Sequence, residues 1–254
     1  MTPEQKAALA RLNQPYSSVN EGWRRTIASA IDDLARWITH DAVIQRLVNQ
    51  FTDTLKPSKM PVLDWRLVRA MIWTETNPYK VSQWSGNVMQ IGVTGDPGMN
   101  VVLQGDENVK LILDDASRKT LTKASITTDP NTNILAGMSY MLSRMCESES
   151  FEEIDPAHPK LSDHVVKKGE TLDAIAKTVG CSTQWLLKLN NQNPKLAIGQ
   201  TIKVQATLRG RRISSWRAFT PENLQSRYNG NGDPHYAKKL HYCLGVMDII
   251  AMPR

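Results

Sequence analysis

The residue of this sequence that is best placed to transfer a proton is Glu75, which follows a run of apolar residues at helical spacing. These residues recur every three or four positions and are Leu67, Val68, Met71 and Ile72. Asn77-Pro78 comes directly afterwards, and proline pushes the residue before it out of the α region. The pattern therefore predicts a helix that ends near Glu75 and carries this carboxylate on its apolar face.

Such a position would raise the pKa of the Glu75 carboxyl group. Burial disfavours the charged form, and the negative end of the helix dipole disfavours it further. A carboxyl group that stays protonated near neutral pH can act as a general acid. The spacing alone is equally compatible with a solvated glutamate that closes an amphipathic helix.

The residues that follow Glu75 form an extended motif. They read Glu75-Thr76, Asn77-Pro78, Val81-Ser82 and Gly86-Asn87-Val88-Met89-Gln90-Ile91. This order resembles the signature of family 1 lytic transglycosylases, lysozyme-like enzymes that cut the glycan chains of peptidoglycan. Two later segments continue the resemblance in the family's order: Asp129-Pro130 with Asn133-Ile134, Gly137, Tyr140 and Leu142, and Arg227-Tyr228-Asn229-Gly230 ending at Tyr236.

The resemblance implies that Glu75 is catalytic and that a substrate cleft surrounds it. The substrate-binding residues that it implies are Ser82, Met89, Gln90, Tyr140, Tyr228 and Asn229. In this chemistry one residue serves first as acid and then as base, so that the MurNAc–GlcNAc β-1,4 bond is cleaved with formation of 1,6-anhydroMurNAc. Thr76 replaces the family's serine, and Asn77 lies two residues closer to Glu75 than in the family pattern.

Two alternatives remain open at this point. A hydrolytic muramidase of the same fold would need a second carboxylate as base or nucleophile, and the candidates are Asp96, Asp106, Glu107, Asp114 and Asp115. Goose-type lysozymes, which are related to the family, have an aspartate directly after the Met-Gln-Val motif, where this sequence has Gly92. The second alternative is a non-catalytic wall-binding or assembly subunit, against which the presence of Glu75 argues.

Residues 164–204 read as strand, two short helices and strand, and they resemble a LysM module over nearly its full length. The resemblance rests on Gly169, Thr171-Leu172, Ile175-Ala176, Leu189-Asn190 and Gly199-Gln200. It implies that two loops form a shallow groove for N-acetylglucosamine units, made by Gly169, Glu170, Thr171, Leu172, Asn193, Pro194, Lys195, Leu196, Ile198 and Gly199. The apolar residues between the loops are expected to form the core of a small βααβ unit.

The whole chain is predicted to be α+β and mostly helical. A lysozyme-like domain is expected over residues 1–160 and 205–254, with the LysM module of 164–204 inserted in it and an exposed acidic linker at 147–163. Residues 1–56 are expected to be helical, with one apolar stripe at Ile27, Ile31, Leu34 and Ile38 and another at Val43, Ile44, Leu47, Val48, Phe51 and Leu55. Residues 101–113 predict a small β-hairpin, because apolar runs flank Gly105-Asp106-Glu107-Asn108.

Charge and composition restrict the partners. A formal charge of +6 favours acidic partners such as the bacterial wall, and the predicted partner is the peptidoglycan glycan strand with its GlcNAc and MurNAc units. The arginines of residues 209–217 lack the interleaved aromatic residues of a single-strand binder, so no nucleic-acid partner is predicted. Three cysteines without CxxC spacing and five histidines without ligand spacing predict neither a metal nor a cofactor.

No stretch is long and apolar enough for a membrane span, and the residues after Met1 lack the apolar region of a signal peptide. Because peptidoglycan lies outside the cytoplasm, we expect a protein made in the cytoplasm and delivered to the periplasm or cell wall by a contractile secretion system or a phage. An injected antibacterial effector would also have a periplasmic inhibitor, or immunity protein, as a partner.

Overall fold

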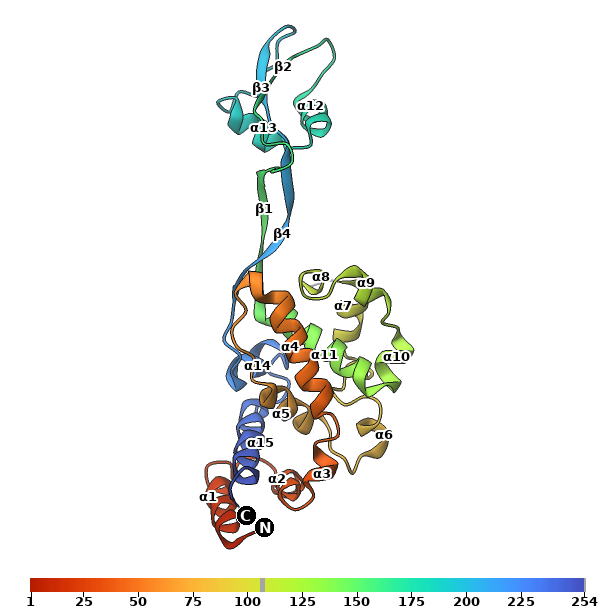
Figure 1. Cartoon of the computed structure of the whole chain (residues 1–254), viewed down its shortest axis with the longest axis vertical. Helices are drawn as coiled ribbons and strands as arrows, with labels where there is room; N and C mark the ends of the chain where they lie inside the picture. Colours follow the sequence, from red (N-terminus) through yellow and green to blue (C-terminus); the bar gives the residue numbers. More distant parts are fainter. Residues whose placement is uncertain (106–107, 254) are drawn as a thin grey trace. The chain divides into compact units, whose positions relative to one another are not determined.

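A computed structural model describes residues 1–105 and 108–253 of the chain (Figure 1). The chain divides into two compact units, Met1–Glu147 with Ile213–Arg254, and Ser148–Arg212. The predicted fold class is confirmed: the chain is mostly helical, and its described residues contain small two-stranded sheets. No helix in the described part of the chain combines the length and apolar character needed to span a bilayer.

The first unit begins with helices, as predicted for residues 1–56. They are α1 (Pro3–Asn13), α2 (Glu21–Ala28), η1 (Ser29–Ile31), α3 (Leu34–Trp37), α4 (Asp41–Leu55) and η2 (Lys56–Ser58). The stripe on α4 is buried except for its first member, Val43, which is partly buried. The other expected stripe, from Ile27 to Ile38, does not lie on a single helix, because its residues are divided among α2, η1 and α3 and the residue after α3. Ile38 is exposed, and Trp37 is buried in its place.

Three later helices form the centre of the first unit. They are α5 (Trp65–Glu75), α11 (Pro130–Met145) and α15 (Tyr236–Ile250), and α14 (Pro221–Arg227) packs against α11 and α15. Helix α15 lies against α5 and also against α1, where a Cβ atom added to Gly245 would stand only 2.6 Å from a methyl group of Leu12. The start of α15 meets the end of α5, where the Tyr236 hydroxyl donates to the Glu75 carboxyl group.

The helix starts follow the chemistry of their first residues. Asp64 accepts a hydrogen bond from the Arg66 backbone N–H at 2.8 Å and caps α5. Asp129 and Thr220 cap α11 and α14 in the same way, each followed by a proline at the first helical position. Helix α15 begins only at Tyr236, after Asp233-Pro234, and lacks a side-chain cap.

The predicted hairpin at 101–113 is wrong. Residues Gly98–Gln104 form helix α7 and Val109–Ile112 form α8, while Asp106 and Glu107 lie outside the described residues. The apolar side chains of this segment also recur at helical spacing, and Val102, Val109 and Ile112 are buried in the core to which α11 contributes. Packing against α11 thus outweighs the strand propensity of these β-branched residues. The remaining short helices are α6 (Val81–Trp84), α9 (Asp115–Lys119) and α10 (Lys123–Thr128).

The second unit contains the predicted βααβ arrangement. Its elements are β2 (Ser162–Val165), α12 (Leu172–Val179), α13 (Thr183–Leu189) and β3 (Thr201–Val204). Strands β2 and β3 are antiparallel, with Ser162 opposite Val204 and Val165 opposite Thr201. The expected core is present, and it is made by Val166, Ile175, Ala176, Cys181, Leu186, Ile202 and Val204 with Leu172 packed against it.

The segment expected as a linker is instead largely a strand. Residues Cys146–Ile154 form β1, which pairs with β4 (Thr207–Trp216). The Glu152 carboxylate accepts hydrogen bonds from the Ser182 backbone N–H and the Thr207 hydroxyl, each at 2.7 Å. Glu152 thereby connects both strands to the start of α13, so its acidic character serves local structure.

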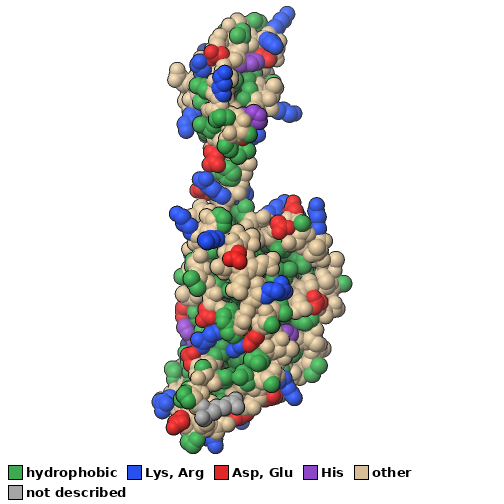
Figure 2. Space-filling view, viewed as in Figure 1, with side chains coloured by type: hydrophobic (Ala, Val, Ile, Leu, Met, Phe, Trp, Pro, Cys, Tyr) green, Lys and Arg blue, Asp and Glu red, His purple; other side chains and the backbone are tan. Residues whose placement is uncertain are grey.

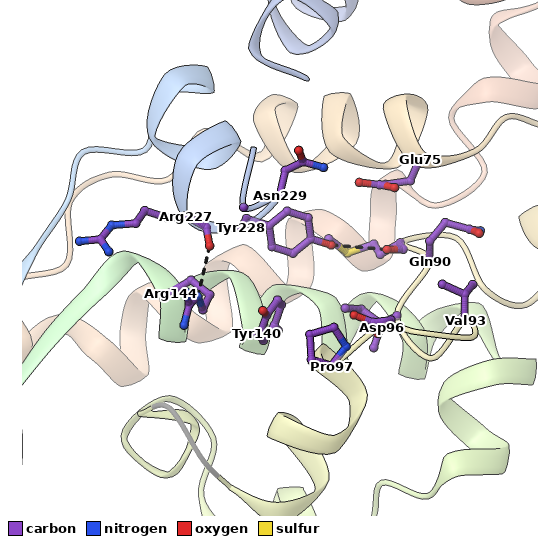
Figure 3. Close-up of a pocket in the computed structure, with 13 residues that line it drawn as sticks. Glu75, Gln90, Val93, Asp96, Pro97, Tyr140, Arg144, Arg227, Tyr228 and Asn229 are labelled. Atoms are coloured by element: carbon purple, nitrogen blue, oxygen red, sulfur yellow. Dashed lines mark hydrogen bonds between the residues drawn. The ribbon is translucent and has the colours of Figure 1, made fainter. Parts of the chain in front are cut away.

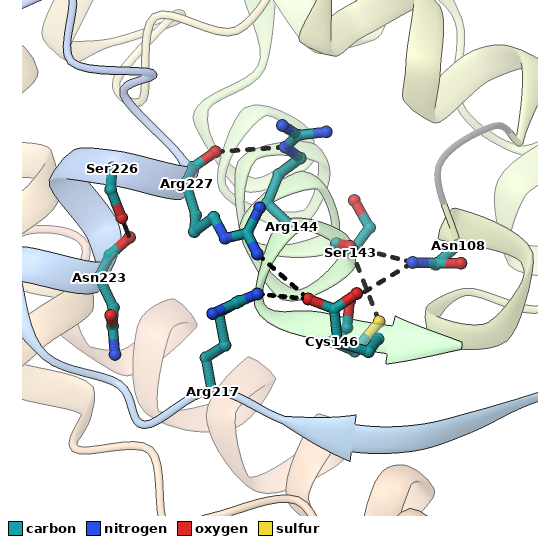
Figure 4. Close-up of polar contacts among 9 residues, drawn as sticks. Asn108, Ser143, Arg144, Cys146, Arg217, Asn223, Ser226 and Arg227 are labelled. Carbon is teal, nitrogen blue, oxygen red and sulfur yellow. Dashed lines mark hydrogen bonds and ion pairs between the residues drawn. The ribbon is translucent and has the colours of Figure 1, made fainter. Parts of the chain in front are cut away.

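Arginine side chains fix the chain where it leaves and re-enters the first unit. The carboxylate of Glu147 accepts from Arg217 Nη2 at 2.6 Å and from Arg227 Nη2 at 3.1 Å (Figure 4). The Arg144 Nε–H donates to the Arg227 carbonyl oxygen at 3.2 Å. The end of α11 is therefore connected to the segment that leads from β4 through α14.

Candidate active site

Glu75 is the last residue of α5, as the sequence predicts. The backbone N–H of Thr76 still donates to the Ile72 carbonyl at 2.9 Å, but Thr76 itself is extended with φ −149°. The helix thus ends one residue before Asn77-Pro78. Its last side chain lies on the wall of a pocket, where the negative end of the helix dipole disfavours a charged carboxylate.

The environment of Glu75 raises the pKa of its carboxyl group to about 7. Burial is the largest cause, and the nearby negative charges of Asp233 and Asp96 act in the same direction. The hydrogen bond from the Tyr236 hydroxyl to Glu75 Oε1, at 2.9 Å, and the positive charge of Lys239 oppose this shift. The carboxyl group is therefore divided between its protonated and ionised forms at neutral pH.

Tyr236 is held as a permanent donor to Glu75. The side chain is fully buried at the start of α15, and burial followed by the negative charge of Glu75 raises the pKa of its hydroxyl well above the ordinary value. The hydroxyl therefore keeps its proton throughout the physiological range. In the family resemblance Tyr236 is only the last residue of a motif. No local spacing in the sequence predicts its contact with Glu75.

The pocket beside Glu75 has a volume of ≈ 340 Å³. In Figure 3, Glu75 and Gln90 lie toward one end of the lining and Arg144 and Arg227 toward the other, with Tyr140 and Tyr228 between them. Five of the six substrate-binding residues implied by the resemblance line this pocket together with Glu75: Met89, Gln90, Tyr140, Tyr228 and Asn229. Ser82 lies on the exposed face of α6 and is not among the lining residues.

The wall formed by Met89 and Gln90 is held by the buried amide of Asn133 on α11. Asn133 Oδ1 accepts from the Met89 backbone N–H at 2.7 Å. Its Nδ2 group donates to Asn87 Oδ1 and to the carbonyls of Ile126 and Ile91, at 2.7, 2.7 and 3.1 Å. Because the side chain is fully buried, these bonds satisfy polar groups that water cannot reach.

Gln90 has a backbone conformation that residues other than glycine rarely adopt. Its φ is +56°, and its Nε2 group donates to the Asn87 carbonyl at 2.6 Å. Gly137 on α11 supports the neighbouring residue, since a Cβ atom there would stand 2.5 Å from Met89 Sδ. A strained residue that the surrounding structure holds in place is typical of binding and catalytic sites.

Two tyrosines also line the pocket. The Tyr228 hydroxyl donates to the Met89 carbonyl at 3.4 Å, and the ring of Tyr228 lies 5.8 Å from that of Tyr140 between centroids. Asn229 Oδ1 accepts from the Asp233 backbone N–H at 2.8 Å, which orders the turn before α15. The tyrosine rings and the amides together give the pocket apolar faces and a few polar groups, as is typical of small-molecule sites.

Of the five acidic residues considered as a second carboxylate, Asp96 lines the pocket. It comes from the wall that faces Glu75 in Figure 3, and its two oxygens accept backbone N–H bonds from Gly92 at 2.7 Å and Gly98 at 2.9 Å. Asp114 caps α9, and Asp115 pairs with Arg118. Asp106 and Glu107 lie outside the described residues.

The two LysM loops predicted to bind glycan lie side by side. The Val166 N–H donates to the Gln200 carbonyl at 2.9 Å, and the Gly199 N–H donates to the Val166 carbonyl at 2.8 Å. Both Gly169 and Gly199 have positive φ, which explains the glycines at these turns. Thr171 caps α12, and Asn193 Oδ1 accepts from the Lys195 N–H at 3.0 Å.

The other loop residues divide between structure and surface. Glu170 Oε2 is hydrogen-bonded to His164 Nε2 at 2.9 Å and accepts the Lys167 N–H at 2.7 Å. Leu172 and Leu196 are half-buried against the core, whereas Pro194 and Ile198 are exposed. Among the residues that the structure describes, no His, Cys, Asp and Glu side chains group as metal ligands would.

Comparison with known proteins identifies part of the chain. Residues 164–205 match the LysM domain family. The chain is also similar to an endolysin of Bacillus phage B103, with 43% identity over 76 residues. This region is 29% of the present chain and 26% of the endolysin, so the chain spans about a quarter of that relative's length. No solved structure matches the chain.

Proposed function

We propose that the protein binds peptidoglycan through its LysM domain and cleaves the glycan strand as a murein lytic transglycosylase. The observation that carries the proposal is the Glu75 carboxyl group, whose pKa is raised to about 7 on the wall of a pocket. A carboxyl group of this kind is suited to general acid catalysis at neutral pH. The match of residues 164–205 to the LysM family and the partial similarity to a phage endolysin support a substrate in the cell wall.

In the proposed mechanism Glu75 acts twice. The protonated carboxyl group donates its proton to the glycosidic oxygen while the bond from MurNAc C1 to that oxygen breaks, and the GlcNAc side leaves as an alcohol. The resulting carboxylate then accepts the proton of the MurNAc 6-hydroxyl as its oxygen bonds to C1. The products are 1,6-anhydroMurNAc and a new GlcNAc end, and Glu75 is protonated again without the consumption of water.

The side chains around Glu75 fit this double role. The Tyr236 hydroxyl donates to Glu75 Oε1 in either protonation state, which stabilises the carboxylate formed after the first step. The other oxygen, Oε2, then remains for the glycosidic oxygen. The tyrosine walls and the Gln90 amide would fix the sugar rings on either side of the bond.

Asp96 favours hydrolysis as a second candidate reaction. It lines the same pocket and would direct a water molecule in a muramidase. Against this role, each of its two oxygens already accepts a backbone N–H group, from Gly92 and from Gly98, so the carboxylate is engaged in holding its own loop. We therefore place the transglycosylase reaction first.

The product separates these possibilities. Purified protein is incubated with peptidoglycan sacculi, and the released fragments are analysed by mass spectrometry. We expect fragments with 1,6-anhydroMurNAc ends, which are lighter than the hydrolytic products by one water. Reducing MurNAc ends would identify a muramidase, and intact sacculi bound by folded protein would identify a non-catalytic wall-binding subunit.

The pH dependence of the reaction should report on Glu75 and Tyr236. The wild-type kcat/KM is expected to fall as the pH rises through about 7, because the general acid is then ionised. Tyr236→Phe removes a hydrogen bond that favours the carboxylate, so the pKa of Glu75 rises and the fall moves to higher pH.

Tyr242→Phe is the matched control for that variant. Tyr242 is another buried tyrosine of α15, and its hydroxyl donates to Asn13 Oδ1 at 3.0 Å rather than to Glu75. In the control variant, kcat/KM should fall at the same pH as in the wild type. The same pH for Tyr236→Phe and the wild type would contradict the assigned role of the hydrogen bond.

A further inference from the structure

The two glycan loops of the LysM domain carry three exposed lysines, of which only Lys195 is among the residues expected to form the glycan groove. Lys167 and Lys168 directly precede Gly169 in the first loop, and Lys195 lies in the second. All three side chains are exposed, and among the described residues no carboxylate forms an ion pair with them. Lys and Arg side chains also stand out from the surface of this unit in the space-filling view (Figure 2).

Half of the lysines of the domain lie in these two loops. Residues 164–205 contain six lysines against two acidic residues, Glu170 and Asp173. Lys203 is neutralised by Asp163 at 2.6 Å, and Lys188 lies 5.6 Å from the ring centroid of Trp185. Glu170 is occupied by His164 and by the Lys167 backbone N–H. The lysines of the loops therefore face solvent as available cations.

Two apolar side chains are also exposed in this part of the domain. Ile198 is 71% exposed in the second loop, and Val165 is 54% exposed at the end of β2. The hydrogen bonds between Val166 and residues 199–200 bring both loops together. Apolar positions with a rim of positive charge fit a ligand that has apolar sugar faces and anionic substituents.

We propose that this lysine rim, Lys167, Lys168 and Lys195, binds the carboxylate groups of the stem peptides that a peptidoglycan strand carries. The inference rests on the proposed wall-binding function and adds a preference for peptide-bearing over uncharged glycan. A strand held on the loops brings its own carboxylates near the lysines. Their attraction therefore adds to binding without the entropic cost of recruiting a separate anion.

The test uses the full chain with Glu75→Gln, so that sacculi are not cut during the measurement. Binding is measured to sacculi freed of teichoic acid, to the same sacculi after carbodiimide coupling to ammonia has converted their carboxylates to amides, and to uncharged chitin oligosaccharides. Two variants are made in this Glu75→Gln background. The test variant carries Lys167→Gln and Lys168→Gln, and the control variant carries Lys177→Gln and Lys188→Gln. Both changes remove two positive charges, and the second pair lies on α12 and α13.

We expect the Lys167 and Lys168 variant to bind native sacculi about threefold to tenfold more weakly, the range given by two exposed charge pairs. It should bind amidated sacculi and chitin as well as its parent does, and raised salt should remove the difference because exposed charges are screened. The control pair should change every affinity by less than about twofold. Arginine at both positions should restore binding to native sacculi.

Several results would overturn the inference. If the two double-lysine variants lose affinity for native sacculi equally, the effect reflects net charge and not the position of the lysines. If the Glu75→Gln parent binds native and amidated sacculi with equal affinity, the carboxylates have no role in binding. In each of these cases wall binding itself stands, whereas a parent that binds neither sacculi nor chitin would contradict the proposed function as well.

Discussion

Glu75→Gln should reduce the release of glycan fragments by about 10³-fold or more, because the general acid and base of the reaction is lost. The amide has nearly the shape of the carboxyl group, and its oxygen can still accept the Tyr236 hydrogen bond. It cannot give a proton to the leaving oxygen or take one from the 6-hydroxyl. Fragment release from sacculi, followed over time by chromatography, measures the effect.

Glu21→Gln provides the control for that substitution. The Glu21 side chain is 70% exposed at the start of α2 and contacts Arg25 at 3.6 Å, so the same chemical change there should leave the rate unaltered. The Glu75 variant should retain the circular dichroism spectrum and the sacculus binding of the wild type. A folded Glu75→Gln protein that works within tenfold of the wild-type rate would remove Glu75 from the mechanism.

Asn133→Ala should lower the free energy of unfolding of the first unit by about 3 kcal/mol and strongly reduce cleavage. The substitution leaves the Met89 N–H and the carbonyls of Ile91 and Ile126 buried without their partner. It also frees the segment that holds Gln90 at its positive φ, so the pocket wall beside Glu75 loses its position. Urea unfolding, followed by tryptophan fluorescence, gives the stability.

Asn131→Ala is the comparison on the same helix. Asn131 is exposed two residues earlier on α11, and the loss of its side chain should cost less than about 0.5 kcal/mol. If both variants unfold at the same urea concentration, the Asn133 network does not stabilise the fold. If Asn133→Ala is unstable but fully active where it is folded, the network does not position the pocket wall.

The parts of the fold that the sequence predicts well are those with a strong local period. Helix α5 ends at Glu75 because its apolar residues recur at helical spacing and Asn77-Pro78 follows. The βααβ unit is recognisable because glycines with positive φ, Gly169 and Gly199, occupy turns that other residues enter only with strain. In the helix the determining interactions lie within a few residues, and in the βααβ unit they lie within residues 162–204.

The errors come from residues whose partners are distant in the sequence. The apolar run at 101–113 suits a strand or a helix, and its contacts with α11 decide for the helix. The acidic segment 147–163 was expected to be a linker because its charges are frequent, but strand β4, about 60 residues later, pairs with it. The composition of one strand does not reveal its partner.

The same reason limits the prediction of the site. The family resemblance implies that Glu75 shares a site with Ser82, Met89, Gln90, Tyr140, Tyr228 and Asn229, and all of these except Ser82 line one pocket. Tyr236 and the placement of Asp96 depend on how α15 and the loop after Gln90 pack, which no local spacing encodes. The raised pKa of Glu75 is likewise a property of the assembled pocket rather than of the helix end alone.

The division of the first unit by an inserted one has a consequence for the order in which the molecule assembles. Tyr236 follows Glu75 by 161 residues, and the 65 residues of Ser148–Arg212, which have their own core and sheet, are synthesised between them. The LysM domain can fold from contacts within its own short sequence, whereas α5 must wait for α15 to arrive from the ribosome. The LysM domain can thus be complete while Glu75 still lacks its tyrosine, so the proposed cleavage activity is acquired last.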